Sequence, residues 1–104
     1  MENIRHLVLS MNSIKDEHLN ALVNAEVLKN LRSLDISSNL ITNDGMKILT
    51  ACEYLINVRN LNLSGNKIGN LGMLTLENAK NFPNLEKLDI CRCGITETGV
   101  DALA

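Results

Sequence analysis

The residues that could support catalysis or metal binding are few and far apart in this chain. Cys91 and Cys93 form a C-x-C pair, but no second cysteine pair or histidine pair accompanies them. A structural zinc site needs four such ligands. His6 and His18 are predicted to lie in different kinds of element, one on a strand and one near a helix start, so they form no obvious catalytic pair. We therefore expect no bound metal and no cofactor.

The carboxylates give no better candidate for catalysis. Asp35 and Asp89 occupy equivalent positions in two predicted strands that have a third strand between them. Two strand spacings place them roughly 10 Å apart, which is too far for the two groups to share a proton. The sequence also lacks a G-x-S-x-G motif, a phosphate-binding glycine loop and an H-E-x-x-H motif. We expect that the protein is not an enzyme.

An internal repeat determines where all these residues lie. Leucine and asparagine make up nearly a third of the 104 residues, and an offset of 27 residues brings the same residue types into register along nearly the whole chain. The first repeat reads Ile4-x-x-Leu7-x-Leu9-x-x-Asn12-x-Ile14. Alternation of Leu7 and Leu9 with His6, Val8 and Ser10, which are expected to be exposed, predicts a short strand. Apolar residues at steps of three from residue 19 to residue 28 predict one face of a helix.

The pattern L-x-x-L-x-L-x-x-[NC]-x-[IL] resembles the signature of leucine-rich repeats. The unit length and the helical second half are similar to the ribonuclease-inhibitor-like class, and the last unit is similar to the cysteine-containing class found beside F-box motifs. The resemblance implies an α/β fold, a right-handed leucine-rich-repeat solenoid of four 27-residue β-turn-α units. The parallel sheet would form the concave face and the helices the convex face. Residues 1–104 would form a single domain with units at 4–30, 31–57, 58–84 and 85–104.

In this family the asparagine that follows each strand stacks with its equivalents as a structural ladder. The resemblance assigns that role to Asn12, Asn39 and Asn66, and to Cys93 in the fourth unit. Thr42 and Thr96 are expected to cap helices. These predictions concern structure rather than recognition.

The strand face that the helices leave open is the predicted binding surface. The residues expected to contact a partner are Asp35, Asn60, Asn62, Lys87 and Asp89, with Arg32 and Arg59 at the edge. Arg5, Arg32 and Arg59 form a row of like charges about 5 Å apart, which is either a solvated edge or a contact for an acidic partner. The face offers only some 300 to 400 Å², whereas a standard interface uses about 800 Å² per partner. We therefore expect that the chain binds a peptide or a small epitope, that loop residues widen the contact, or that the chain belongs to a longer array.

Composition excludes several other functions. A net charge of -2, a pI near 5.6 and 2% aromatic residues argue against nucleic-acid binding. No apolar run approaches the roughly 20 residues that cross a membrane, and the first residues lack a signal-peptide pattern. Three cysteines are too few for a disulfide scaffold. We expect a cytoplasmic protein.

The function predicted from these features is a non-catalytic protein-protein interaction module that binds a protein or peptide through the concave sheet face. Three alternatives remain open: a regulator of an enzyme, of the nuclease-inhibitor or GTPase-activator type; the substrate-recognition part of a ubiquitin-ligase assembly; and a fragment of a longer array. Both solenoid ends should expose leucines, because the chain begins with a regular unit and stops at Ala104 inside the fourth. Self-association through these uncapped ends, or truncation from a larger protein, is therefore expected.

Overall fold

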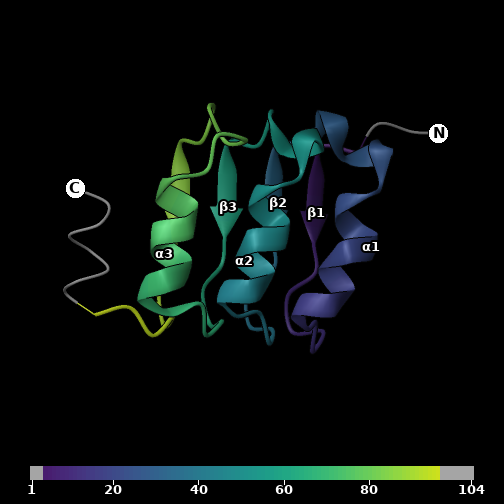
Figure 1. Ribbon diagram of the computed structural model, residues 1–104. Coiled ribbons are helices and arrows are strands. Elements are labelled where there is room, and N and C mark those ends of the chain that lie inside the picture. Colours follow the sequence, from purple (N-terminus) through teal and green to yellow (C-terminus); the bar gives the residue numbers. More distant parts are fainter. Residues whose placement is uncertain (1–3, 97–104) are drawn as a thin grey trace.

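The computed structural model describes residues 4–96, which form a strand layer and a helix layer. Four short strands, β1 (His6–Val8), β2 (Ser33–Asp35), β3 (Asn60–Asn62) and β4 (Lys87–Asp89), form a parallel sheet in the order β1-β2-β3-β4 (Figure 1). His6 pairs with Ser33, Ser33 with Asn60, and Asn60 with Lys87. Neighbouring strands are thus aligned with the offset of 27 residues that the sequence repeat predicts.

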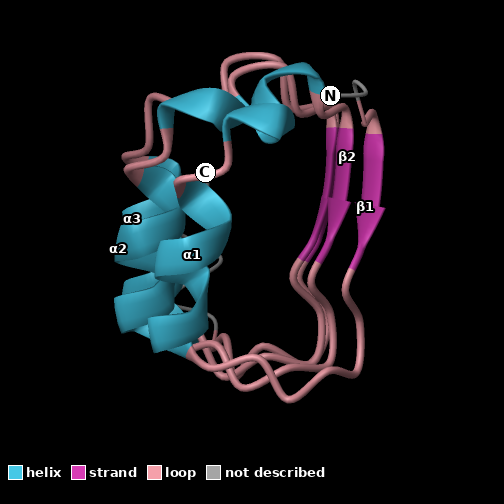
Figure 2. Ribbon diagram, turned by 90° about the vertical axis from the view of Figure 1, so that its right-hand side faces the viewer, coloured by secondary structure: helices cyan, strands magenta, loops and turns pink. Residues whose placement is uncertain are grey.

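The second layer consists of helices that cover one face of the sheet. The helices α1 (Leu19–Val23), α2 (Asn43–Thr50) and α3 (Gly69–Glu77) lie side by side. Short 3-10 helices accompany them at η1 (Asp16–His18), η2 (Glu26–Asn30) and η3 (Glu53–Leu55). Figure 2 shows the strands and the helices on opposite sides of the molecule, so that the outer face of the sheet has no covering element among residues 4–96.

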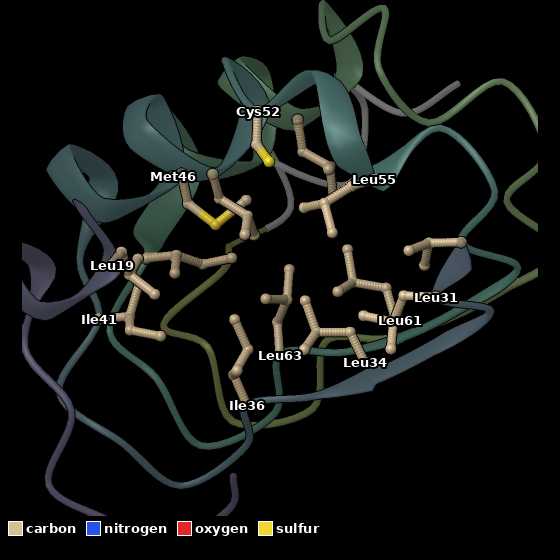
Figure 3. Close-up of a cluster of buried hydrophobic side chains, with 14 of the residues drawn as sticks. Leu19, Leu31, Leu34, Ile36, Ile41, Met46, Cys52, Leu55, Leu61 and Leu63 are labelled. Carbon is tan, nitrogen blue, oxygen red and sulfur yellow. The ribbon is translucent and has the colours of Figure 1, made fainter. Parts of the chain in front are cut away.

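The core lies between the two layers and is built from the repeated apolar positions. Leu34 of β2 is 1% exposed and Leu61 of β3 is 2% exposed, and Met46 of α2 packs from the other side (Figure 3). Because side chains alternate across a strand, the flanking residues of each strand face outward instead. Burying one such leucine stabilises the fold by about 1.5 to 3 kcal/mol.

The prediction of one continuous helix over residues 19–28 is wrong. The helix α1 ends at Val23, Ala25 is extended, and the chain then forms the separate 3-10 helix η2. The second repeat behaves in the same way, with extended Cys52 between α2 and η3. Apolar residues exactly three positions apart suit a 3-10 helix of 3.0 residues per turn better than an α-helix of 3.6. The break therefore keeps Leu28 and Leu55 buried in the core.

Two buried glycines allow the helices to begin close to the preceding chain. A Cβ atom at Gly45 would lie 2.7 Å from the Cγ2 of Ile41, and one at Gly72 would lie 2.7 Å from the Cβ of Ile68. Glycine provides this space in the second and third repeats, whereas the first repeat has His18 at the equivalent position. The equivalent Gly99 of the fourth repeat lies outside the described residues. Within residues 4–96, no helix has the length and apolar character needed to cross a membrane.

The uncovered sheet face as candidate functional site

The outer face of the sheet carries a shallow depression of about 230 Å³ that extends from β2 to β4. It brings together five of the seven residues predicted to bind a partner. These are Asp35, Asn60, Asn62, Lys87 and Asp89. Arg32 and Arg59 do not line the depression, because each precedes its strand by one residue and lies at the edge of the face.

The last residue of each of the strands β2, β3 and β4 is partly engaged by its own backbone. The Oδ1 atom of Asp35 accepts a hydrogen bond from the N–H of Ser37 at 2.9 Å, and Asn62 accepts one from Ser64 at 3.0 Å. Asp89 accepts the equivalent bond from Cys91 at 3.0 Å. This turn was not predicted from the sequence, although Asp and Asn side chains commonly bond the backbone two residues ahead. These side chains therefore terminate the strands and are held in a fixed orientation on the open face.

The turn also sets the ionisation of two groups at the end of β4. Hydrogen bonds from the backbone N–H and the side chain of Cys91 lower the pKa of the Asp89 carboxyl group. The hydrogen bond to Asp89, together with its negative charge, raises the pKa of the Cys91 thiol. The exposed thiol is therefore held in the neutral form, which is the poorer nucleophile.

The arginine row continues the hydrogen bonding of the sheet beyond the strands. The carbonyl oxygen of Arg5 accepts bonds from the N–H groups of Arg32 at 2.7 Å and Ser33 at 3.0 Å, and Arg32 repeats this arrangement with the next repeat. The side chain of Arg59 lies 3.8 Å from the Glu86 carboxylate, and both side chains are more than half exposed. Such an ion pair contributes little to stability. The backbone of the row is structural, while its side chains remain available to solvent.

Below the face, Asn39 and Asn66 join neighbouring repeats. Asn66 is fully buried; its Nδ2 donates to the carbonyl oxygens of Ile36 and Leu63, both at 2.9 Å, and its Oδ1 accepts from the N–H of Ile41 at 3.1 Å. Asn39 makes the corresponding bonds one repeat earlier, with its Oδ1 accepting from the N–H of Ile14 at 3.0 Å. Each amide thus satisfies backbone groups that the turning chain leaves without sheet partners.

The two outer members of the predicted ladder differ from these. Asn12 is exposed, and its Nδ2 donates to Ser10 in its own turn at 3.0 Å rather than to a neighbouring repeat. The reason is that β1 is the edge strand of the described sheet. Cys93 is buried, and its Sγ lies 3.1 Å from the carbonyl oxygen of Leu63. Burial raises the pKa of this thiol, so that it remains a neutral donor to that carbonyl.

The structure also assigns roles to asparagines that the repeat aligned without explanation. Asn57 donates from Nδ2 to the carbonyl oxygen of Lys29, and Asn84 donates to that of Ile56, both at 2.9 Å. Each bond reaches back into the preceding repeat. Asparagine side chains thus join adjacent repeats at both ends of the strands.

A tight turn follows each strand and places one residue in the left-handed region. The φ angles are +56° at Met11, +54° at Ser38, +73° at Gly65 and +56° at Arg92, which are equivalent positions of the four repeats. Only Gly65 adopts this conformation without a steric penalty. The turn is imposed by the stacking of repeats, because three of its four residues disfavour it.

Other candidate chemistry on this face is limited. The Nδ1 atom of His6 lies 3.0 Å from the Oγ of Ser33, both on the open face. Residues 4–96 contain no group of three or more His, Cys, Asp or Glu side chains arranged to hold a metal ion. Cys52, Cys91 and Cys93 are all free thiols.

Comparison with known proteins agrees with this geometry. Three segments, residues 27–49, 54–76 and 83–104, match the family model described as Leucine Rich repeat. A search of curated proteins found no match.

Proposed function

The chain belongs to the leucine-rich-repeat family, whose model matches more than half of its length, and from this we propose that it binds a partner protein through the open face of its sheet. Leucine-rich repeats are generally protein-interaction modules and present extended concave surfaces for binding. The observation that carries the proposal is that five predicted contact residues surround one depression on the uncovered face. Fold membership alone would not locate the partner.

The small size of this face limits the partner. Each strand has only three regular residues. The sheet face is therefore smaller than one built from strands of average length. A standard interface needs about 800 Å² per partner. The partner therefore contacts the turns after the strands as well, or it presents a narrow segment to the strands.

Further features of the proposal concern class, catalysis and location. The 27-residue register and the helix in each of the first three repeats support a ribonuclease-inhibitor-like, right-handed solenoid with the strands on the concave side. The family is generally non-catalytic, which supports a role without chemistry of its own. Three free cysteines support a reducing, cytoplasmic location.

Site-specific photo-crosslinking tests the proposal. A photoreactive phenylalanine analogue replaces exposed Asn60 on β3 in one variant and exposed Lys47 on α2 in the control, and each is irradiated in a cell lysate. We expect one partner to be crosslinked at position 60 and not at position 47, with mass spectrometry identifying it. If the partner is a nuclease, a small GTPase or a ubiquitin-ligase subunit, its identity indicates which of the more specific roles applies. Equal crosslinking at both positions, or crosslinking only at position 47, would contradict binding through the sheet.

A further inference from the structure

The open face carries two rows of opposite charge that run across the strands. The arginine row (Arg5, Arg32 and Arg59) lies at the edge of the face before β1, β2 and β3, and Glu86 takes the equivalent position before β4. The aspartate row (Asp35 and Asp89, with Asn62 between them) ends β2, β3 and β4. Arg32 and Asp35 are three residues apart in one chain, which corresponds to about 10 Å along a strand. The depression is lined by the aspartate row and by Asn60 and Lys87, which lie between the two rows. A partner on this face therefore meets positive charge on one side and negative charge on the other.

Arg5 and Arg32 of the arginine row, and both carboxylates of the aspartate row, have no ion-pair partner in the described part of the chain. Arg59 pairs with Glu86. The turn bonds to Ser37 and Cys91 hold the two carboxylates by one oxygen each. A side chain that is already ordered loses less conformational entropy when it binds.

The end of the aspartate row at β1 is apolar. Val8 stands in register with Asp35 and is 66% exposed, and Met11 in the turn that follows is 79% exposed. The first repeat thus has an exposed apolar residue where the second has a charged one. The two ends of the row differ in chemistry, which gives the face a direction across the strands.

We propose that this face binds a helical segment of a partner protein that lies across the strands, with acidic side chains over the arginine row, basic side chains over the aspartate row and an apolar side chain over Val8. The inference rests on the proposed function and specifies its partner. A separation of about 10 Å between the rows matches the diameter of an α-helix, 10 to 12 Å with side chains. Four strands about 4.8 Å apart span about 14 Å, which is the length of roughly ten helical residues at 1.5 Å each.

Two synthetic peptides of identical composition test the charge order. The ordered peptide is a 15-residue helix that carries Glu along one side and Lys along the opposite side. The helix face between these two sides has a Leu at each end. The mixed peptide has Glu and Lys interchanged at alternate positions, so that both flanks carry both charges. Fluorescence anisotropy at low ionic strength should show the ordered peptide binding at least tenfold more tightly. Equal affinity of the two peptides, or binding of neither, would overturn the inference.

Substitutions in the two rows then test whether the ordered peptide binds to them. Arg32→Gln with Arg59→Gln, and Asp35→Asn with Asp89→Asn, should each weaken the ordered peptide about tenfold, and Val8→Ser should weaken it several-fold. Asparagine keeps the turn after the strand, as Asn62 shows, so the aspartate variants remove charge without removing that bond.

The controls carry the same change in net charge on the helix side. Lys47→Gln with Lys80→Gln matches the arginine variant, and Glu53→Gln with Glu77→Gln matches the aspartate variant; all four residues are exposed. Controls that weaken the peptide as much as the face variants would overturn the inference. If crosslinking at position 60 identifies a partner while the two peptides bind equally, the proposed function stands and the charge order fails.

Discussion

At the scale of single residues, the ends of the strands combine structure and recognition. Asp35, Asn62 and Asp89 were predicted to contact a partner, and that prediction remains untested. The structure adds that each of them accepts a hydrogen bond from the backbone two residues ahead. A substitution such as Asp35→Arg would therefore disturb both the surface and the turn. Asparagine is the replacement that separates the two effects.

The contact between Asp89 and Cys91 should lower the reactivity of the Cys91 thiol. Replacing Asp89 with Asn removes the negative charge that, with its hydrogen bond, raises the pKa of the Cys91 thiol. The thiolate is the reactive form, so a lower pKa gives more thiolate at a given pH. We expect Asp89→Asn to increase the rate of Cys91 alkylation by iodoacetamide at pH 7.5 several-fold and to move the pH profile of the rate to lower pH.

Mass spectrometry of the alkylated peptides measures this rate for each cysteine. Asp35→Asn is the matched control, because it removes the same charge from β2, where Ser37 and not a cysteine occupies the position two residues ahead. The control should leave the Cys91 rate unchanged. An unchanged or slower rate in Asp89→Asn would show that the carboxylate does not control the thiol.

At the scale of elements, adjacent repeats are joined by buried amides as well as by strand pairing. Asn66 bonds to the carbonyl oxygen of Ile36, which lies 30 residues earlier in the chain. Asn57 and Asn84 make comparable bonds near the other end of the strands. These contacts fix how one strand-turn-helix unit sits on the next, which strands of three residues each could define only weakly.

Replacing Asn66 with Ala should be strongly destabilising. The change leaves the buried N–H of Ile41 without a hydrogen-bond partner, which costs about 1 to 3 kcal/mol. It also removes the bonds to the carbonyl oxygens of Ile36 and Leu63, each worth about 0.5 to 1.5 kcal/mol, although Ile36 keeps its bond from Asn39. We expect the free energy of unfolding in urea to fall by about 3 kcal/mol or more. Asn12→Ala at the equivalent exposed position should lower it by less than about 1 kcal/mol. Similar losses in the two variants would contradict the assignment of the buried amide as an essential link.

At the scale of the whole molecule, the strand leucine that faces the helices is almost fully buried in the two middle repeats but only half-buried in β1. Leu34 and Leu61 are almost fully buried, whereas the equivalent Leu7 is half-buried. In a stacked array each repeat is stabilised chiefly by its neighbours. An edge repeat should therefore open more often than a central one.

Three equivalent backbone amides allow this to be measured. The N–H groups of Leu9, Ile36 and Leu63 each donate to the next strand, at 2.7, 3.0 and 2.9 Å. Their hydrogen bonds are alike, but Leu9 is half-buried while Ile36 and Leu63 are 0% exposed. Exchange with solvent reports local opening, so the Leu9 amide should exchange at least tenfold faster by NMR. Equal protection of all three amides would show that the chain opens only as one unit.

The sequence by itself determined the repeat, the strand register and the core positions. A constant spacing of 27 residues allows only one alignment of the strands, and the period-two pattern decides which leucines face the helices. The sequence also indicated the open face, because each unit supplies helices for one side of the sheet only.

The tertiary structure alone decided how the remaining residues are used. Stacking breaks the predicted helix at Ala25 and places Met11, Ser38 and Arg92 in the left-handed region. It also buries Asn66 but leaves Asn12 exposed at an equivalent position. The local sequence cannot specify the role of Asn66, because its bonds join backbone groups 25 and 30 residues away in the chain that come within reach only when one repeat stacks on the next.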